Sequence, residues 1–454
     1  MLKDAAISVV RTLREHGHQA YLVGGCVRDL LLGRRPADYD VATDAPPERV
    51  MRIFPQTYAV GAQFGVVLVP VRDGFDESDV PPEHNRVIEV ATFRSDVGYS
   101  DGRHPDQVVY SKTPAEDVQR RDFTINGLML DPLSGEVLDF VGGQTDLRAG
   151  IIRTIGAPRQ RFHEDKLRLL RAVRFAARFG YAIEDSTFSA IKELASSIHQ
   201  VSRERVRDEL TKMLTEGQAR RAFELLDATG LLREVLPEIS AMKGVEQPPQ
   251  FHPEGDVFVH TLIMLAMLPP GCSRTLAWGV LLHDVGKPPT FRVGEDRIRF
   301  DGHVEIGEKM AQEICRRLRM SNEDTQQILA LVANHMRFAD VQRMKESTLK
   351  RFLRLRDFHE HLELHRIDCL GAHGKLDLHE FVREKLRSTP PDEIRPEPLI
   401  SGHDLIAEGI KPGPAFKEIL AAVEDAQLEG MLKNKNEAMD FVRQFVLSNP
   451  DLVS

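Results

Sequence analysis

Residues 22–43 read LVGGCVRDLLLGRRPADYDVAT, and this stretch decides the fold of the first part of the chain. The apolar residues 21–23 are typical of the end of a buried strand, and Gly24-Gly25 and a helix start follow directly. A strand, a glycine turn and a helix N-terminus place backbone N–H groups where an anion can bind. The stretch therefore predicts a phosphate-binding turn.

Two carboxylates, Asp38 and Asp40, follow this turn with one residue between them. Residues i and i+2 of a strand project from the same face, so we expect the two side chains to lie together. Like charges held that close are costly unless a cation neutralises them, and paired carboxylates beside a phosphate cradle suit Mg²⁺ and a nucleoside triphosphate. Either pattern alone is more typical of a solvated turn, but both in this order favour the metal–nucleotide site. Glu89 is a candidate third carboxylate that the sequence does not decide.

The composition is that of an ordinary globular protein of 454 residues with a formal net charge of −9. This length implies two to four domains, and the negative charge argues against a general nucleic-acid coat protein. The four cysteines are far apart in sequence and form no C-x-x-C pair, which favours a reducing compartment. We find no signal-peptide pattern and no segment apolar enough for a membrane span, so we expect a cytoplasmic protein without a membrane partner.

The sequence predicts an α+β fold that is divided into four segments. Residues 1–155 alternate strand and helix patterns and predict a catalytic domain with a small mixed β-sheet. From residue 161 the pattern is helical, with apolar positions at helical spacing over 162–179. We therefore expect a helical neck and body over 156–245, a helical and histidine-rich domain over 256–385, and a helical tail over 395–454.

Four ordered motifs in residues 20–180 carry a resemblance to a known family. They are LVGGCVRDLLLG with the following D-Y-D, then RRDFTINGLMLD, DFVGGQTDLRAGIIRTIG and EDKLRLLRAVRFAARFG. Together they resemble the class II tRNA nucleotidyltransferase and bacterial poly(A) polymerase family. The resemblance implies a Mg²⁺-dependent transfer of nucleoside monophosphate from a triphosphate onto an RNA 3′ hydroxyl.

The resemblance also implies roles for residues of the first two motifs. Asp38 and Asp40 would be catalytic and would hold two Mg²⁺ ions. Gly25 and Arg28 would contact the triphosphate, because glycine lets the backbone approach closely. Arg121 would bind nucleotide or phosphate; the structural alternative is an ion pair with Asp122.

In the fourth motif the family reads the incoming base from a protein template. An ionised Asp165 can only accept hydrogen bonds and Arg168 can only donate them, so the pair can match an edge of cytosine or adenine. Side chains three residues apart share one helix face, and Arg171 and Arg174 continue that face toward phosphate or base. An amphipathic helix with solvated arginines is the plain alternative for this motif alone.

The product within the family depends on two further segments. Residues 60–67, VGAQFGVV, look like the tRNA-specific branch rather than the poly(A) branch. Residues 93–108 have polar turn chemistry and predict a long mobile loop, similar to the loop that the family needs for adding the terminal adenosine. We therefore expect addition of C, C and A from CTP and ATP to tRNA, with A-only addition or poly(A) synthesis as the alternative.

A second set of residues resembles the metal-site pattern of the HD superfamily. It consists of His260, His283-Asp284 in LLHDVGKP, and Asp368. Imidazole and carboxylate are good ligands for a divalent transition metal, and the resemblance implies phosphoester hydrolysis over residues 256–385. Asp284 could bridge to a second metal or orient a water, while Gly286 suits a turn at a helix end. Further ligands or phosphate contacts are expected at His303 and His335.

Two other readings of the whole chain remain. In one, the protein is chiefly an HD phosphohydrolase whose amino-terminal half only binds nucleotide; in the other, it is a non-catalytic RNA-binding protein. Paired metal carboxylates at Asp38 and Asp40 favour the transferase over both. Basic residues of the helical middle are candidates for RNA contact, although a solvated helix face explains them equally well: Arg203, Arg205, Arg207, Lys212, Arg220 and Arg221.

Overall fold

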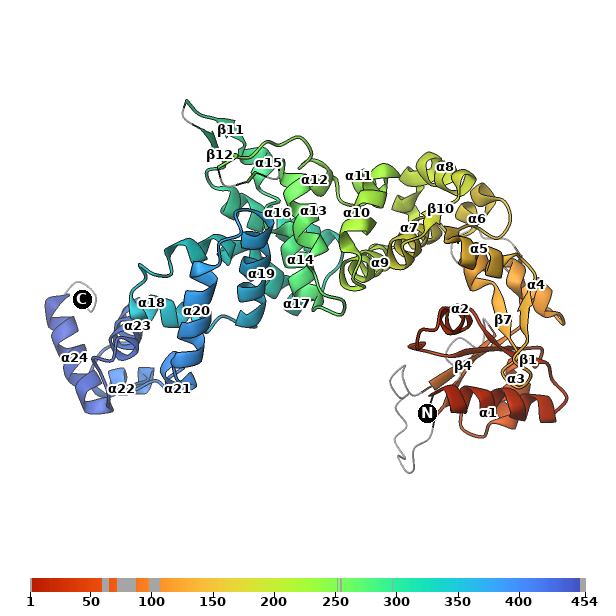
Figure 1. Ribbon diagram of the computed structural model, residues 1–454. Helices are drawn as coiled ribbons and strands as arrows, with labels where there is room; N and C mark the ends of the chain where they lie inside the picture. The colour runs from red at the N-terminus through yellow and green to blue at the C-terminus, as the bar shows by residue number, and fades with distance from the viewer. Residues whose placement is uncertain are drawn as a thin grey trace. The chain divides into compact units, whose positions relative to one another are not determined.

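The computed structural model describes residues 2–58, 65–71, 87–97, 107–250, 252–253, 255–295 and 297–449. The chain forms two compact units, Met1–Ser240 and Ala241–Ser454. The first combines a sheet with helices and the second is almost entirely helical (Figure 1), which confirms the α+β prediction. Within the described ranges, every helix is too short or too polar to cross a membrane.

A six-stranded mixed sheet forms the centre of the first unit. Its strand order is β3-β4-β2-β1-β7-β8, in which β2 and β4 are parallel and the other neighbours are antiparallel. The inner strands β1 and β2 are mostly buried, as their runs of apolar residues predict. The strands are β1 Ala20–Val23, β2 Asp40–Thr43, β3 Val66–Pro70, β4 Val87–Thr92, β7 Leu128–Leu130 and β8 Val137–Asp139.

Short helices cover this sheet and connect its strands. Figure 1 shows α1 and α3 along one side of the sheet and α2 on the other. Helix α1 is amphipathic and buries Ala6, Val9, Val10 and Leu13 against the strands. The helices of this region are α1 Leu2–Glu15, α2 Gly25–Leu31, α3 Pro47–Ile53, α4 Pro114–Gln119, η3 Thr124–Asn126 and α5 Gly143–Ala149.

The rest of the first unit is a helical neck, in which α6 and α7 lie between the two strands of the short parallel pair β9 and β10. The helical pattern predicted from residue 161 is present as α6 and α7, but the expectation that Asp165 and Arg168 share one helix face was wrong, because the chain is extended at Asp165. The elements are β9 Ile151–Ile152, α6 Pro158–Glu164, α7 Leu167–Phe179, β10 Ala182–Ile183, α8 Asp185–Leu194, η4 Ala195–Gln200, α9 Arg203–Thr215, α10 Ala219–Ala228, α11 Leu231–Val235 and α12 Pro237–Ser240.

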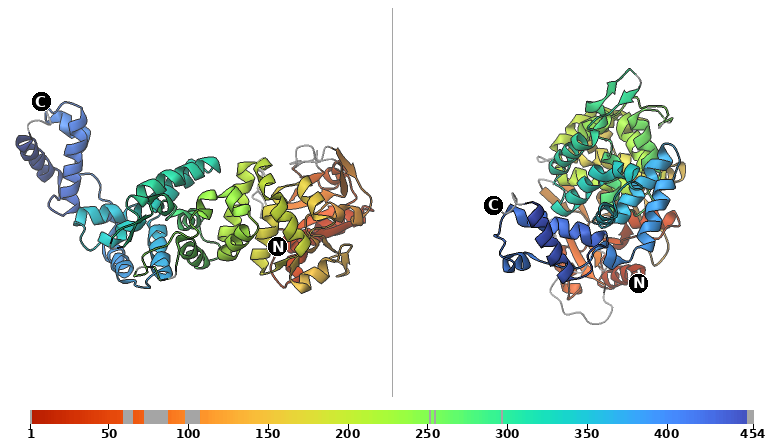
Figure 2. Two further views of the ribbon diagram at one scale, coloured as in Figure 1. Left: turned by 90° about the horizontal axis from the view of Figure 1, so that it is seen from above. Right: turned by 90° about the vertical axis from the view of Figure 1, so that its left-hand side faces the viewer.

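The second unit is helical apart from the small hairpin β11–β12. Its last three helices enclose a hydrophobic cluster of their own around Leu405, Ile419 and Val442, and they stay together in both views of Figure 2. The elements are α13 Val257–Ala266, α14 Arg274–Leu282, α15 Lys287–Thr290, β11 Arg292–Val293, β12 Ile298–Arg299, α16 His303–Arg317, α17 Asn322–Asn334, η5 His335–Asp340, α18 Glu346–Leu353, α19 Phe358–Gly371, α20 Asp377–Ser388, α21 Pro391–Ile394, α22 Gly402–Ala407, α23 Pro414–Leu428 and α24 Lys435–Ser448.

The segment 93–108 differs from the predicted loop. Its first and last parts are strands, β5 Arg94–Val97 and β6 Gln107–Tyr110, which pair antiparallel from Arg94 opposite Tyr110 to Val97 opposite Gln107. The polar composition therefore concealed a hairpin. Residues 98–106 between these strands lie outside the described residues, as do residues 60–64 of the segment that favoured the tRNA-specific branch.

Candidate functional site

The first candidate site lies where β1, β2 and β4 meet. Asp40 is the first residue of β2, and the sheet register places it beside Val23 of β1 and Glu89 of β4. Asp38 precedes the strand and is exposed, with the buried Tyr39 between the two aspartates. The expectation that both aspartates stand on the strand was wrong at Asp38, because β2 begins at Asp40.

Three carboxylates act on one another at this point. The pKa of Asp40 is raised to about 7, because burial disfavours its charged form and the charges of Glu89 and Asp38 add to that effect. The guanidinium of Arg121 acts in the opposite direction. A cation among the three carboxylates would relieve the repulsion, and an all-oxygen donor set fits Mg²⁺. Glu89, which the sequence left undecided, thus lies with the predicted pair.

The glycine turn brings the backbone close to these carboxylates. Gly24 has a φ of 72°, a conformation that costs side-chain-bearing residues energy. A Cβ at this position would lie 3.2 Å from Nη1 of Arg121 and 4.0 Å from Oδ2 of Asp40. The absence of a side chain at residue 24 therefore lets Arg121 stand over the turn beside Asp40.

Arg121 is oriented by a carboxylate other than the one expected. Its Nε and Nη2 donate to Oδ2 of Asp117 over 3.3 and 3.0 Å, and Asp117 is fully buried. Arg120 donates to the other oxygen of the same carboxylate. The suggested ion pair of Arg121 with Asp122 was wrong, because α4 places Asp117 one helical turn before Arg121.

Arg28 lies inside the protein rather than at the open end of the turn. Its guanidinium donates to Oδ1 of Asp29 over 2.8 Å and to Oδ1 of Asn126 over 2.6 Å, and it lies 4.6 Å from the ring centre of Phe179. Its predicted contact with triphosphate stays a prediction. Gly25 lies next to it, since a Cβ there would be 3.6 Å from Nη2 of Arg28.

A buried polar network connects Arg28 to the neck helix α7. Asn126 donates to Oδ1 of Asp122 over 3.0 Å, and Arg171 donates from two nitrogens to Oδ2 of Asp122 over 2.8 and 2.6 Å. The charge of Arg171 and these hydrogen bonds outweigh burial and lower the pKa of Asp122 to about 2. Arg174 is also buried and donates to Glu209 of α9 over 2.6 Å. The described contacts of Arg171 and Arg174 are thus with acidic side chains of the protein.

The predicted base-reading pair stands at the break between α6 and α7. Asp165 accepts hydrogen bonds from the backbone of Leu167 over 3.1 Å and from Nη2 of Arg205 over 2.9 Å. Arg168 is buried and donates to Glu164 over 2.8 Å and to the carbonyl of Arg120 over 2.9 Å. The two residues therefore do not share one continuous helix, although each is held in place by a charged partner.

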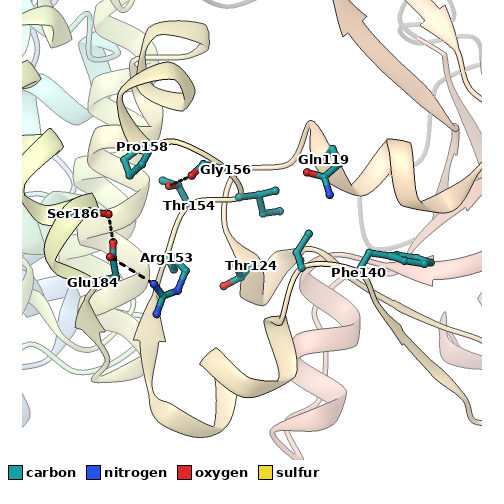
Figure 3. Close-up of a pocket in the computed structure, with 11 residues that line it drawn as sticks. Gln119, Thr124, Phe140, Arg153, Thr154, Gly156, Pro158, Glu184 and Ser186 are labelled. Atoms are coloured by element: carbon teal, nitrogen blue, oxygen red, sulfur yellow. Dashed lines mark hydrogen bonds and ion pairs between the residues drawn. The ribbon is translucent and has the colours of Figure 1, made fainter.

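A separate cavity of about 360 Å³ is lined in part by Thr124 of the second motif. Figure 3 shows Gln119, Thr124 and Phe140 on one side of it and Arg153 with Glu184 on the other. Arg153 and Glu184 form an ion pair of 3.5 Å, and Ser186 donates to Glu184 over 2.7 Å. Neither aspartate of the first candidate site lines this cavity, so the cavity does not indicate where the metal-dependent reaction takes place.

The second candidate site gathers all six residues predicted in the histidine-rich region. One atom each from His260, His283 and Asp368 lies within 4.8 Å of the others, and the same holds for Asp284, His303 and His335. The site is built from α13, the end of α14, the first residue of α16, the start of η5, and α19. Such mixed imidazole and carboxylate sets suit divalent transition metals.

Two residues beside this cluster were not singled out from the sequence. Lys287 is buried, and its Nζ lies 2.7 Å from Oδ2 of Asp284 and donates to Oε1 of Gln247 over 2.7 Å. The spacing His-Asp-x-x-Lys was the available signal, since three residues bring the amine back to Asp284 on one turn. Nothing in the local sequence indicates Gln247, because it comes from a segment 40 residues away.

Parts of the chain match three described protein families. Residues 20–153 match "Poly A polymerase head domain", residues 180–243 match "Probable RNA and SrmB- binding site of polymerase A", and residues 302–442 match the family described as "tRNA nucleotidyltransferase domain 2". These matches follow the order of the predicted segments, while the division into four segments stays a prediction.

Curated relatives are named CCA-adding enzyme. That of Geobacillus kaustophilus is 42% identical over 238 residues, which is 52% of this chain and 55% of the relative, so this alignment spans about half of each protein. That of Geobacillus stearothermophilus is 33% identical over 441 residues, covering 95% of this chain and 94% of the relative.

Solved structures give the same result for the fold. The Bacillus stearothermophilus CCA-adding enzyme in complex with CTP has a TM-score of 0.74 at 29% identity and covers 99% of this chain and 98% of its own. The Thermotoga maritima CCA-adding enzyme complexed with tRNA has a TM-score of 0.56 at 18% identity, with coverage of 98% and 95%, which shows a shared fold alone. On the nearly full-length match to the Geobacillus stearothermophilus protein, this chain belongs to the family of CCA-adding enzymes, the class II tRNA nucleotidyltransferases.

Proposed function

We propose that this protein adds C, C and A to the 3′ end of tRNA, using CTP and ATP and no nucleic-acid template. The observation that carries the proposal is that Asp40 and Glu89 lie side by side in neighbouring strands. The charges of Asp38 and Arg121 also act on the pKa of Asp40. A binding module gains nothing from such a costly cluster. Related enzymes solved with CTP, with ATP and with tRNA bear the same family name.

In this proposal Asp38 and Asp40 are the catalytic residues and hold two Mg²⁺ ions, with Glu89 beside them. The metal would supply a lowered pKa for the attacking 3′ hydroxyl and charge stabilisation for the triphosphate. Arg121 faces Asp40 across Gly24, where its guanidinium can hold a phosphate oxygen while Asp117 fixes its orientation. Gly25 and Arg28 belong to the same turn; in this proposal both contact the triphosphate, for which the buried guanidinium of Arg28 has to leave Asp29 or Asn126.

Asp165 and Arg168 would select the base. Arg205 and the backbone of Leu167 fix the carboxylate of Asp165, and Glu164 fixes the guanidinium of Arg168. Groups held in this way keep their donor and acceptor directions before the nucleotide arrives, which is how a protein can substitute for a template. In our proposal Arg171 and Arg174 support this helix face from within, through Asp122 and Glu209.

The test uses tRNA substrates that end before, within and after the CC sequence, incubated with labelled CTP or ATP and Mg²⁺. We expect C incorporation on the first two substrates and A on the third, and none of it with Asp40→Asn. Glu48→Gln, which changes an exposed acid on α3, serves as the matched control and keeps incorporation. Incorporation of A alone would favour A-only addition, long A tails would favour a poly(A) polymerase, and full activity of Asp40→Asn would refute the metal assignment.

The second unit supports a second candidate function, a metal-dependent phosphohydrolase. The supporting observation is that its six predicted ligands lie together in two groups. We propose that His260, His283, Asp284 and Asp368 hold a divalent transition metal there, and that His283→Ala removes metal-stimulated phosphatase activity while nucleotide addition continues. Loss of both activities in this variant would indicate a structural role instead. If only phosphatase activity is found in the whole protein, the transferase proposal is wrong.

We also propose that the protein works in the cytoplasm. All four cysteines, Cys26, Cys272, Cys315 and Cys369, are free thiols, and three of them are buried. Free buried thiols are typical of a reducing compartment, where tRNA and nucleoside triphosphates are found.

A further inference from the structure

Two aromatic rings of the neck helix α7 hold the guanidinium of Arg28. Phe175 and Phe179 are one helical turn apart, and their rings stack with centres 6.1 Å apart and 16° between their planes. The guanidinium carbon of Arg28 lies 4.6 Å from the ring centre of Phe179 and 5.4 Å from that of Phe175. At these distances a cation is attracted to an aromatic ring. The contact therefore joins α2, which follows the glycine turn, to α7.

The rings hold Arg28 in a different way from its hydrogen-bond partners. Asp29 accepts a hydrogen bond from Nε over 2.8 Å, and Asn126 accepts one from Nη1 over 2.6 Å. Both bonds depend on the direction of an N–H group, whereas the ring attracts the charge above its face and uses no N–H group. The guanidinium can thus exchange Asn126 for another acceptor and still keep its contact with Phe179.

Two further cations meet at the ring of Phe179. The guanidinium carbon of Arg34 lies 5.3 Å from its centre and that of Arg178 lies 5.4 Å from it. The backbone N–H of Arg34 donates to the carbonyl of Asp29 over 2.8 Å, which fixes the loop after α2. Burial lowers the pKa of Arg28; the charge of Asp29 opposes this effect and that of Arg178 adds to it. Three cations around one ring favour the approach of a polyanion.

From this arrangement we propose that Phe179 is a positioning residue for the triphosphate. Its ring keeps the guanidinium of Arg28 beside the glycine turn while a phosphate oxygen takes the place of Asp29 or Asn126. The inference rests on the transferase proposed above, in which Arg28 contacts the triphosphate. Phe179 acts through Arg28 and does not itself touch the nucleotide.

The position of Phe179 in α7 separates its effect from base choice. Arg168, which we propose reads the base, is the second residue of this helix, and Phe179 is the last. One helix therefore serves the base at its N-terminal end and the triphosphate at its C-terminal end. Since CTP and ATP share the triphosphate, the loss of the ring should weaken both nucleotides alike.

The test measures binding of CTP and ATP, each with Mg²⁺, to the full-length protein by isothermal titration calorimetry. Phe179→Leu keeps an apolar side chain but removes the ring face, and we expect a roughly two- to thirtyfold weaker Kd for both nucleotides. Phe179→Tyr keeps the ring and should bind both normally, because Phe179 is only half-buried and the added hydroxyl can reach water. If Phe179→Leu fails to fold, Phe179→Met replaces it.

The matched control is Phe188→Leu. Phe188 is a half-buried phenylalanine of α8 whose ring has Nζ of Lys192 at 5.9 Å, and this variant should bind both nucleotides normally. In the incorporation assay, KM of Phe179→Leu should rise by the same factor for CTP and ATP, while the preference for CTP over UTP stays unchanged. This pattern distinguishes positioning of the triphosphate from a general loss of structure.

Three outcomes would overturn the inference. A lower melting temperature of Phe179→Leu with unchanged Kd values would show that the ring is merely structural. Equal losses in Phe179→Leu and Phe179→Tyr would show that the ring face does not matter, and a loss for one nucleotide alone would exclude an effect on the triphosphate. Binding is measured without RNA, so an unaltered protein that binds both nucleotides and incorporates neither would refute the transferase and leave the role of Phe179 standing.

Discussion

Arg205 of α9 donates a hydrogen bond from Nη2 to Oδ2 of Asp165 over 2.9 Å, across 40 residues of sequence. Arg205 was a candidate for RNA contact, but this bond assigns it a partner inside the protein. Asp165 lies between α6 and α7 and has no helix of its own to orient it. The arginine therefore fixes the direction of the carboxylate that we propose reads the incoming base.

The first prediction concerns Arg205→Gln. The change removes a charge-assisted hydrogen bond, which contributes roughly 1.5–3 kcal/mol, so we expect a roughly ten- to hundredfold loss of discrimination between CTP and UTP. Discrimination is measured as the ratio of kcat/KM values on tRNA ending before CC. Arg207→Gln is the matched control, because Arg207 bonds to its neighbour Asp208 on the same helix. Equal discrimination in both variants would exclude a positioning role for Arg205.

The second prediction concerns the network of Arg171, Asp122 and Asn126. Asp122→Asn keeps the shape of the side chain but removes the carboxylate that accepts two hydrogen bonds from Arg171, which keeps only Glu209 at 4.0 Å among the described residues, so we expect a cost of about 1.5–3 kcal/mol. We expect a lower midpoint of urea unfolding, followed by far-ultraviolet circular dichroism. Asp208→Asn, at an exposed acid of α9, should leave the midpoint unchanged. A midpoint that does not move in Asp122→Asn would show that the network contributes little to stability.

The sequence was sufficient for the parts of the site that rest on local patterns. The strand, turn and helix around Gly24 appear as predicted, because apolar runs and glycine determine them within a few residues. The six ligands of the second unit also came from a pattern, since helix spacing and chemically distinct residue types identify them.

Other features depend on partners that are distant in sequence. Glu89 joins Asp40 only through the parallel register of β4 and β2, which no local pattern specifies. The break at Asp165 was missed because apolar spacing continues through it, while the bond from Arg205 that holds the extended residue comes from α9. Likewise, Arg121 forms its ion pair with Asp117 because α4 ends just before Arg121. The polar residues 93–108 begin and end in strands that pair with each other.

The third prediction concerns pH. His361 is buried against Phe358, and burial together with the charge of Arg337 lowers its pKa to about 4 from an ordinary value of 6.5. The unfolded chain therefore binds a proton between pH 6.5 and pH 4 that the folded protein does not bind. The stability from this neutral histidine is complete above pH 6.5 and falls as the pH is lowered toward 4, by up to about 3 kcal/mol.

His361→Leu should remove that dependence. We expect the free energy of unfolding of the variant to fall less steeply than that of the unaltered protein over this pH range. The only tryptophan, Trp278, is buried in α14 of the same unit, so its fluorescence reports the relevant transition. The exposed His359, replaced by Gln, provides the control. Parallel pH curves for His361→Leu and the unaltered protein would contradict the lowered pKa.

The fourth prediction separates two glycines of the first motif. Gly24 and Gly33 both have positive φ values, 72° and 67°, so alanine is strained at both positions, and the ψ of −131° at Gly24 lies outside the left-handed α region. Their surroundings differ: a Cβ at residue 24 would lie 3.2 Å from Nη1 of Arg121, whereas a Cβ at residue 33 would meet nothing within 4 Å. Both alanine variants therefore carry backbone strain, but only Gly24→Ala displaces Arg121.

We expect both Gly24→Ala and Gly33→Ala to lose thermal stability, while only Gly24→Ala loses nucleotide incorporation. A shift of the guanidinium by a few tenths of an ångström weakens its hold on phosphate, so KM for both CTP and ATP should rise together and base choice should stay intact. Base choice depends on Asp165 and Arg168, which Gly24 does not contact in the described structure. Normal KM values in Gly24→Ala, or equal losses of incorporation in both variants, would show that the close approach at Gly24 does not position Arg121 for the reaction.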